Sequence, residues 1–245
     1  MTLIRRFFNF NKLKLVKLLN ISSVSGFSSI LLSSRLIFRP CSKSQSSISC
    51  VPTSNNFSTA PRMAKSALVL IVEGTEEMEF TITADVLRRA GVKVVVAGVE
   101  GSNPVKCSRD VVIVPDTSLA EAVKKGPYDA VVLPGGMGYK KFATSTEVGS
   151  VLSKQEETGG IIAAICAAPS VLKTHSIATG KSLTSYPSVK GELVKDYKYS
   201  EDKVVVDGNL ITSRGPGTAF DFALELAKQL TNKTKADEVK AGLLL

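Results

Sequence analysis

The sequence predicts an α/β fold in which a mainly parallel β-sheet is covered by helices on both faces. From Ser66 onward, short runs of β-branched residues alternate with longer amphipathic segments, and glycines and prolines lie between them. No internal repeat and no linker interrupts this alternation. The chain has 245 residues and 44% hydrophobic content, which is enough for one sizeable core. We therefore expect one α/β domain over residues 63–245, preceded by a separate segment over residues 1–62.

Four strands and two helices are expected in the first half of this domain. Each expected strand is a short apolar run rich in valine, and each expected helix is an amphipathic segment that follows such a run. In chain order, the strands cover residues 67–72, 92–99, 110–114 and 128–133, and the helices cover residues 76–91 and 118–126.

The second half continues the alternation up to residue 230. It begins with the loop PGGMGYKKF, and its apolar run IIAAI lies between two segments of helical character. Near its end, the turn Asp207-Gly208-Asn209 joins two further strands. We expect a loop at 134–142, a helix at 146–160, a strand at 161–165, a helical segment after Cys166, a strand pair within 203–213 and a helix at 218–230.

Four of the expected strands are followed by glycine-rich or polar turns. In open α/β sheets, ligands bind outside the carboxyl ends of the strands. We therefore predict that a single functional site is formed by the turns EGTEEME (73–79), PGGMG (134–138), CAAPS (166–170) and SRGPG (213–217).

Cys166 lies where the run IIAAI turns into the next helical segment, and it is the candidate nucleophile. A residue on a tight strand-to-helix turn points its side chain outward. Small neighbours such as Ala167 permit the turn, and the helix start offers N–H groups and partial positive charge, which favour a thiolate. We therefore expect a lowered pKa for the Cys166 thiol. The alternative is a buried, inert cysteine that packs as a small hydrophobic side chain.

Two neighbouring turns contain groups that can assist a nucleophilic sulfur. Gly135 and Gly136 allow backbone N–H groups to approach an oxygen anion closely, as an oxyanion hole requires. The turn after the first strand contains Glu76, Glu77 and Glu79. A carboxyl group pressed beside a thiolate is driven toward its protonated form and then donates a hydrogen bond to the sulfur. The residue types alone do not choose among the three glutamates.

The excess of positive charge is confined to the start of the chain. The formal net charge is +9, but ten of the 31 Lys and Arg residues lie within residues 1–65, where no Asp or Glu occurs. The remaining residues include 21 basic and 22 acidic side chains, so their formal charge is −1 and we expect no stable nucleic-acid complex. No apolar run approaches the roughly 20 residues that span a bilayer, so no membrane span is expected.

Residues 1–62 have the composition of an organellar targeting leader. The stretch LIRRFFNFNKLKLVKLLN mixes basic and apolar residues at spacings that suit an amphipathic helix, and serine-rich, acid-free sequence follows it. We predict import into the mitochondrion, with the leader disordered or cleaved. The alternatives are a disordered tail and a leader that is bypassed when translation starts at Met63, which gives a form in the cytoplasm and nucleus.

The cysteine and histidine content argues against a disulfide framework and a metal site. Cys41 and Cys50 lie in the leader, which leaves Cys107 and Cys166 for the domain. Since His175 is the single histidine of the chain, no Cys/His zinc site can be assembled. We expect neither a metal nor a cofactor.

Five segments together resemble a known family. They are EGTEEME (73–79), VKCSRDVVIVPD (105–116), GPYDAVVLPGG (126–136), IIAAICAAPSVL (161–172) and ITSRGPGTAF (211–220). In this order they are similar to the DJ-one/PfpI superfamily, specifically the branch of the Parkinson-disease-associated protein deglycase. The resemblance runs from Ala64 to the C-terminus and implies a flavodoxin-like three-layer sandwich.

The resemblance also implies roles for individual residues. It places the reactive cysteine at Cys166 and assigns the protonated acid that hydrogen-bonds the sulfur to Glu79. It places the glycine pair of the family at Gly135 and Gly136, and we expect these amides and that of Ala167 to bind an oxyanion.

A homodimer is a further implication of the resemblance. Arg109 and Arg214 correspond to arginines near the cysteine or the dimer interface, and Cys107 to a secondary cysteine near that interface. We therefore expect these three residues to make dimer or anion contacts.

The activity that the resemblance implies is directed at methylglyoxal-type dicarbonyls. The protein is expected to act as a glyoxalase that needs no glutathione, and as a deglycase that removes early glycation adducts from proteins and nucleotides, which protects against oxidative and carbonyl stress. The alternative is a non-enzymatic redox sensor or chaperone-like protein that acts through oxidation of Cys166.

One position departs from the family pattern. The family branch commonly has a histidine, proposed as the general base, where this chain has Tyr186 in TSYPSVK. A phenol is a poor base at neutral pH, although it can donate a hydrogen bond, so proton transfer is expected to rely on Glu79. His175 is expected to be a surface or helix-cap residue. Protease relatives have a histidine directly after the nucleophile, and Ala167 at that position disfavours a peptidase.

Overall fold

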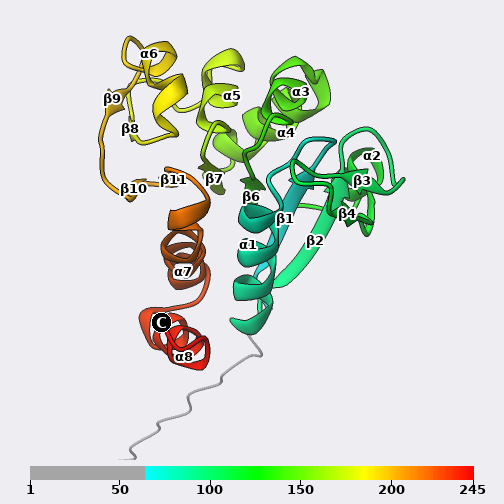
Figure 1. Cartoon of the computed structure of the whole chain (residues 1–245), viewed down its shortest axis with the longest axis vertical. Coiled ribbons are helices and arrows are strands. Elements are labelled where there is room, and N and C mark those ends of the chain that lie inside the picture. Colours follow the sequence, from blue (N-terminus) through cyan, green and yellow to red (C-terminus); the bar gives the residue numbers. More distant parts are fainter. Residues whose placement is uncertain (1–63) are drawn as a thin grey trace, which may run out of the picture. The chain divides into compact units, whose positions relative to one another are not determined.

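A seven-stranded sheet in the order β10-β11-β7-β6-β1-β2-β5 organises the computed structural model, which describes residues 64–245 (Figure 1). The leader predicted over residues 1–62 lies outside the described residues and stays a prediction, as does initiation at Met63. All neighbouring strands are parallel except β10 and β11. The strands are β1 (Ser66–Ile71), β2 (Lys93–Gly98), β5 (Thr117–Ser118), β6 (Ala130–Leu133), β7 (Ile161–Ile165), β10 (Val204–Asp207) and β11 (Leu210–Ser213).

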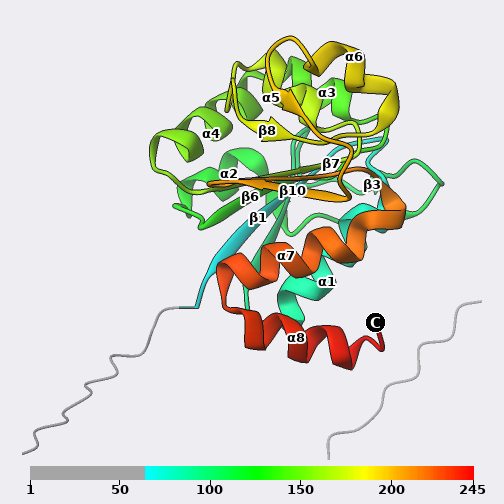
Figure 2. The ribbon, with the colours of Figure 1, turned by 90° about the vertical axis from the view of Figure 1, so that its left-hand side faces the viewer.

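Helices cover both faces of the sheet, as Figure 2 shows with the sheet viewed nearly edge-on. One face carries α1 (Glu77–Arg89), α7 (Ala219–Leu230) and α8 (Lys233–Gly242). The other face carries α2 (Leu119–Lys124), α3 (Tyr139–Thr144), α4 (Thr146–Glu157), α5 (Pro169–Thr174) and α6 (Lys190–Leu193). Two short 3₁₀ turns, η1 (Pro187–Val189) and η2 (Pro216–Thr218), complete the set. The predicted three-layer α/β sandwich with a mainly parallel sheet is confirmed.

The central strands are buried on both faces, which explains why their sequences are continuous apolar runs. Their register aligns apolar side chains in rows across the sheet. In one such row, Val69 pairs with Val96 on β2 and with Val132 on β6. The row continues through Ala163 on β7 to Ile211 on β11. All five side chains are buried, so the row forms part of a core that fixes the register of β1, β6 and β7.

Two small sheets lie outside the main one. The strand predicted over 110–114 is only β4 (Val112–Ile113), and it pairs antiparallel with β3 (Val105–Lys106). All three valines of the predicted run are exposed, so this apolar segment lies at the surface and not in the core. The other small sheet joins β8 (Ser182–Leu183) to β9 (Lys198–Tyr199), neither of which the sequence pattern predicted.

Further differences concern helices. The loop predicted over 134–142 ends in α3, and the C-terminal residues form α8. No described helix is long and apolar enough to cross a membrane.

The strand order brings the four predicted turns together. β1, β6, β7 and β11 are consecutive neighbours and run in the same direction. Their carboxyl ends therefore lie along one edge of the sheet, and the turns after them face a common space. This is the arrangement that the positions of the turns predicted.

Candidate active site

Cys166 ends β7 in a strained backbone conformation. Its φ is +65°, a left-handed value that few residues other than glycine adopt. The strand ends at Ile165 and helix α5 begins at Pro169, so only three residues make the change of direction. This is the predicted strand-to-helix elbow.

Two backbone hydrogen bonds hold the elbow in place. The N–H of Cys166 donates to the carbonyl oxygen of Ser213 at 3.0 Å, and the N–H of Tyr186 donates to the carbonyl oxygen of Cys166 at 2.7 Å. The strained residue is thus fixed from both sides by segments that are distant in the sequence. Sequence patterns did not reveal these two contacts, because a backbone donor or acceptor leaves no mark in the residue type.

Glu79 is the glutamate that reaches the cysteine, and its side chain is fully buried. The other two glutamates of the turn have structural contacts. A carboxylate oxygen of Glu76 accepts a hydrogen bond from the N–H of Glu79 at 2.8 Å and so caps α1. Glu77 accepts a hydrogen bond from the N–H of Arg109 at 2.7 Å. The geometry therefore selects Glu79, the residue that the family resemblance implies.

Gly135 holds the carboxyl group of Glu79 beside the sulfur. Its N–H donates to Oε2 of Glu79 at 2.7 Å. A Cβ atom at this position would lie 2.6 Å from Cβ of Cys166 and 2.8 Å from Oε2 of Glu79, so only glycine fits. The prediction that Gly135 binds an oxyanion is therefore wrong, because its N–H is already used by the carboxyl group.

The other two predicted amides do face the sulfur. The N–H groups of Gly136 and Ala167 lie at the Cys166 sulfur and favour its charged form, which opposes the rise of the thiol pKa. Gly136 has a φ of +83°, and a Cβ there would lie 2.4 Å from the carbonyl oxygen of Gly74. The tight backbone turn at Gly136 thus brings its amide to the sulfur.

Glu79 and Cys166 shift one another's pKa. Burial raises the pKa of Glu79 to about 7, although the hydrogen bonds from Gly135 and Cys166 oppose the shift. Burial, and then the charge of Glu79, raise the pKa of the Cys166 thiol to about 12. Yet Oε1 of Glu79 is buried without an aligned hydrogen-bond partner, so the carboxyl–thiol contact is close without being a well-formed hydrogen bond. Above the pKa of Glu79, the pair therefore carries one negative charge and one proton.

The expected lowering of the Cys166 pKa is wrong, because burial is the largest cause of the raised pKa and the charge of Glu79 adds to it. The residue is only 8% exposed, so its sulfur is recessed rather than outward-facing. The dipole of a helix as short as α5 and two amide donors do not outweigh this burial and a neighbouring carboxylate. Transfer of the proton to Glu79 removes the repulsive charge, and the amides of Gly136 and Ala167 then stabilise the thiolate.

Tyr186 lies next to the elbow through its backbone, while its side chain is 46% exposed. The ring lies near Gly215, where an added Cβ would be 3.4 Å from Cδ2 of the tyrosine.

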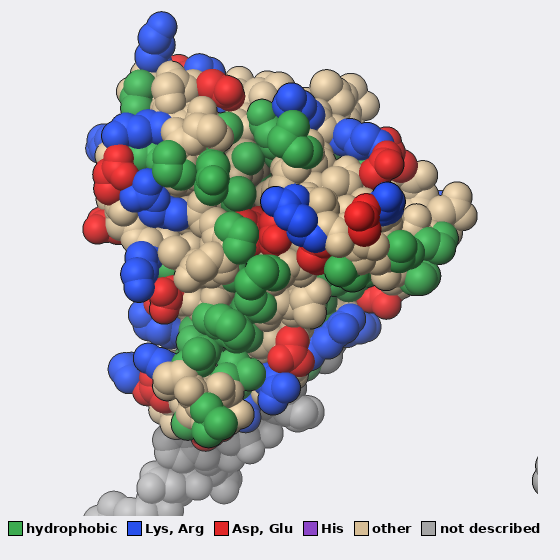
Figure 3. Space-filling model, viewed as in Figure 1, with side chains coloured by type: hydrophobic (Ala, Val, Ile, Leu, Met, Phe, Trp, Pro, Cys, Tyr) green, Lys and Arg blue, Asp and Glu red, His purple; other side chains and the backbone are tan. Residues whose placement is uncertain are grey.

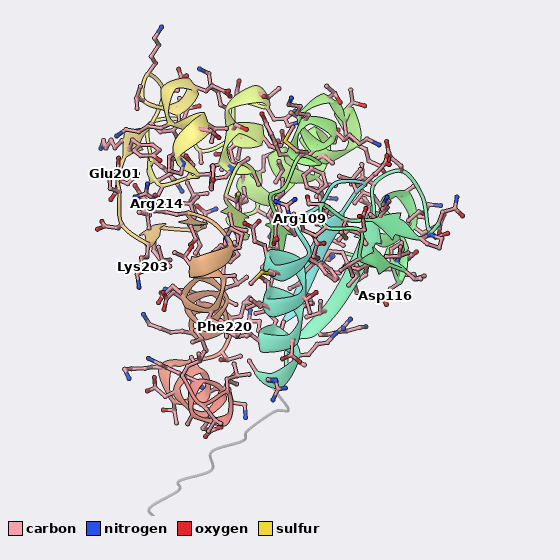
Figure 4. The ribbon with its side chains drawn as sticks, viewed as in Figure 1. Arg109, Asp116, Glu201, Lys203, Arg214 and Phe220 are labelled. Atoms are coloured by element: carbon pink, nitrogen blue, oxygen red, sulfur yellow. The ribbon has the colours of Figure 1, made fainter. Side chains whose placement is uncertain are left out.

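The two predicted arginines lie apart, as Figure 4 shows. Arg109 lies in the turn of the β3–β4 hairpin, near the start of α1, and its guanidinium donates to the carbonyl oxygen of Ser108 at 3.0 Å. Arg214 donates to the carboxylate of Glu201 at 2.6 Å, so this cation is already paired. Cys107 is buried in the hairpin turn, where burial and then the charge of Glu77 raise its pKa to about 11. None of the three makes an anion site with Cys166 in the described residues.

His175 caps the C-terminal end of α5, as predicted. Its Nε2 lies 3.2 Å from the carbonyl oxygen of Phe142, so it packs against α3 and not in the site. Residues 64–245 contain no cluster of His, Cys, Asp and Glu side chains that could hold a metal ion.

Comparisons with known proteins match the sequence and the fold of this chain. A model described as the DJ-1/PfpI family matches residues 65–229. Protein dj-1beta of Drosophila melanogaster is 61% identical over 185 residues, which cover 75% of this chain and 98% of the relative. The Caenorhabditis elegans protein named glutathione-independent glyoxalase DJR-1.2 is 42% identical over 183 residues, which cover 74% of this chain and 97% of the relative.

Solved structures agree with the sequence matches. The crystal structure of Drosophila melanogaster DJ-1beta aligns with a TM-score of 0.73 and 61% identity, and the alignment covers 75% of this chain and 99% of that structure. The structure titled Toxoplasma gondii DJ-1, oxidized, aligns with a TM-score of 0.67 and 35% identity, covering 74% and 98%. The predicted family resemblance and the flavodoxin-like fold are thereby confirmed.

Replacing Glu79 by glutamine is expected to change how stability depends on pH. The raised pKa of Glu79 means that the folded protein keeps a proton that the unfolded chain loses near pH 4.5. The wild type should therefore lose about 3 kcal/mol of unfolding free energy, relative to Glu79→Gln, as the pH rises from 4.5 through 7. Urea unfolding across this range measures the difference. Glu157→Gln, at an exposed acid, is the control, and equal pH slopes for all three proteins would contradict the prediction.

Gly135→Ala is expected to destabilise the elbow, because the added methyl group would overlap Cys166 and Glu79. Overpacking of this kind costs about 1–3 kcal/mol. Gly217→Ala is the matched control, since an added Cβ there meets no atom within 4 Å. Urea unfolding should separate the two variants by more than 1 kcal/mol. Equal stability would show that the glycine is not needed for packing.

Proposed function

Because the chain belongs to the DJ-1/PfpI family, we propose that it is a cysteine-dependent enzyme that converts methylglyoxal-type dicarbonyls to hydroxy acids without glutathione. The observation that carries this proposal is the Cys166 thiol on a strained elbow beside the buried carboxyl group of Glu79. The C. elegans relative that is named a glutathione-independent glyoxalase supports the same choice.

The first step is addition of the Cys166 sulfur to the aldehyde carbon of the dicarbonyl. The thiol proton passes to Glu79, whose pKa of about 7 suits a group that accepts and returns a proton near neutral pH. The sulfur–carbon bond forms as the carbonyl π electrons move to oxygen. The amides of Gly136 and Ala167 lie at the sulfur, next to where this oxygen anion develops.

The remaining steps need no external oxidant. Glu79 first returns its proton to the oxygen anion, which gives a hemithioacetal. As a carboxylate again, it removes the proton from the former aldehyde carbon and delivers that proton to the neighbouring carbon of the resulting enediol. The first carbon is thereby oxidised to a thioester and the second is reduced to an alcohol. Water then cleaves the sulfur–carbon bond, which releases lactate from methylglyoxal and restores the thiol. The net reaction consumes one water molecule for each dicarbonyl.

Deglycation extends the same chemistry to early adducts of proteins and nucleotides. In an aminocarbinol adduct, the sulfur displaces the amine, so that the sulfur–carbon bond forms while the carbon–nitrogen bond breaks. Glu79 gives its proton to the departing amine. The hemithioacetal that remains is the intermediate of the glyoxalase sequence, so both activities use the same two side chains.

The second candidate function is redox sensing through Cys166, with a chaperone-like protective role. The solved T. gondii relative titled as oxidized favours it, as does the carboxyl group of Glu79 beside the sulfur. Hydrogen peroxide would transfer one oxygen atom to the thiolate and leave as water, and a second equivalent would give the sulfinate. The proton on Glu79 and the amides of Gly136 and Ala167 would stabilise that anion.

We also propose that the protein is a homodimer. Apolar side chains are exposed around the β3–β4 hairpin and the start of α1, where Met78 is 52%, Val112 60% and Val114 66% accessible. Figure 3 shows hydrophobic side chains on the face that carries these elements. Nearby, Oε2 of Glu77 is buried without a hydrogen-bond partner among the described residues. A second copy would cover the apolar side chains and bring new donors to this oxygen.

Cys166→Ala is expected to abolish lactate formation from methylglyoxal, with a loss of at least about a hundredfold, because it removes the sulfur that attacks the aldehyde carbon. Cys107→Ala is the matched control at the other described cysteine and should keep the wild-type rate within about twofold. Lactate is measured enzymatically on the purified chain. A wild-type rate no faster than that of Cys166→Ala would overturn the enzyme proposal, and mass gain at Cys166 under hydrogen peroxide would then support the sensor.

The double variant Val112→Asp, Val114→Asp is expected to sediment as a monomer, while the wild type sediments as a dimer. Two carboxylates in an apolar contact would be desolvated without partners, which is unfavourable. Val206→Asp, on the edge strand β10, is the control and should remain dimeric. Sedimentation equilibrium gives the masses, and a monomeric wild type would contradict the proposed assembly.

A further inference from the structure

The aromatic ring of Tyr186 is attached to the same backbone that carries the nucleophile. The N–H of Tyr186 donates to the carbonyl oxygen of Cys166 at 2.7 Å, which joins the two residues directly. Tyr186 is extended, with φ −61° and ψ 138°, and the 3₁₀ turn η1 starts immediately after it. The backbone of Tyr186 therefore lies directly against the elbow, and the chain continues from there into the 3₁₀ turn.

The ring also lies against the loop that follows β11. Gly215 in this loop has no side chain, and an added Cβ would stand 3.4 Å and 3.8 Å from two edge carbons of the tyrosine ring. The same loop begins after Ser213, whose carbonyl oxygen accepts the N–H of Cys166. The ring thus bridges the two segments that hold the strained cysteine. Almost half of the Tyr186 surface remains exposed, so one side of the ring is open to a ligand.

The segment below the ring is firmly supported. The hydroxyl group of Tyr199 lies 3.1 Å from Oγ of Ser185 and donates to the carbonyl oxygen of Ser185 at 3.2 Å. The N–H of Thr184 donates to Oγ1 of Thr212, on β11, at 2.9 Å. Thr184 and Ser185 are fully buried, whereas Tyr186 is exposed. The exposed ring is therefore held on a fixed support, as a preorganised contact surface requires.

We propose that Tyr186 determines substrate specificity as an aromatic wall for the carbon substituent of the dicarbonyl. This inference rests on the proposed function and names its substrate class: 2-oxoaldehydes with an aryl or extended apolar substituent. A planar aromatic face gains from stacking with another ring, whereas a methyl group covers little of it. The wall acts through contact with the substituent, and the phenol hydroxyl takes no part in it.

The test compares phenylglyoxal with methylglyoxal in the wild type, Tyr186→Phe and Tyr186→Ala. The ratio of the two kcat/KM values should fall about tenfold in Tyr186→Ala. Tyr186→Phe should keep the wild-type ratio, because the ring is retained. An unchanged kcat/KM ratio in Tyr186→Ala would overturn the proposed role of the ring. An equal fall of the ratio in Tyr186→Phe would also overturn it, because that result would assign the effect to the hydroxyl group.

A second measurement does not depend on turnover. The Cys166 thiol is alkylated with N-phenylmaleimide and with N-ethylmaleimide, and the rates are read by peptide mass at Cys166. The wild type and Tyr186→Phe should favour the phenyl reagent, and Tyr186→Ala should lose several-fold of that preference. If neither dicarbonyl is converted but this preference is found, the proposed function fails and the wall stands. If the dicarbonyls are converted but Tyr186→Ala keeps both the substrate preference and the maleimide preference of the wild type, the proposed role of Tyr186 fails while the proposed function stands.

Discussion

The proton shared between Glu79 and Cys166 is the interaction on which the site depends. Both groups are withdrawn from water, so neither carries a charge as readily as it would in solution. One negative charge can be tolerated there, because Gly135 donates to the carboxyl group and the amides of Gly136 and Ala167 favour the charged form of the sulfur. The sulfur gains its charge only when the carboxyl group takes the proton. The pair thus has two states, a thiol beside a carboxylate and a thiolate beside a carboxylic acid, which differ in the position of one proton.

The topology explains how residues distant in the sequence meet at this pair. Glu79 comes from α1 after β1, Gly135 from the turn after β6, and Cys166 from the end of β7. Since β1, β6 and β7 are consecutive parallel strands, these three turns lie side by side. The middle turn has to pass between a carboxyl group and a sulfur-bearing side chain, and glycine is the residue that leaves room for both. The close packing of these three turns therefore requires glycine at position 135 of the site.

The sequence predicted the features that depend on local pattern. Apolar runs located the main strands, and small residues around Cys166 indicated the elbow. The features that it did not predict depend on tertiary contacts. That the N–H of Gly135 serves Glu79, and not a substrate oxygen, follows from where α1 places its carboxyl group. The raised pKa of Cys166 follows from burial, which no local pattern reports. The exposed valines of 110–114 have strand character, but the main sheet ends at β5 and does not include them.

The strained backbone of Cys166 connects the reactivity of its sulfur with the surroundings of the site. A left-handed conformation at a residue with a side chain costs about 1–2 kcal/mol, and it persists because neighbouring segments hold it. The segments contribute the carbonyl oxygen of Ser213 and the N–H of Tyr186, which bind the elbow from its two sides. The backbone that maintains the strain therefore also carries the Tyr186 ring and the Gly215 turn next to it. A change in the backbone of residues 184–186 would alter the elbow and its surroundings together, whereas a change of the Tyr186 side chain leaves the hydrogen bond to the Cys166 carbonyl oxygen in place.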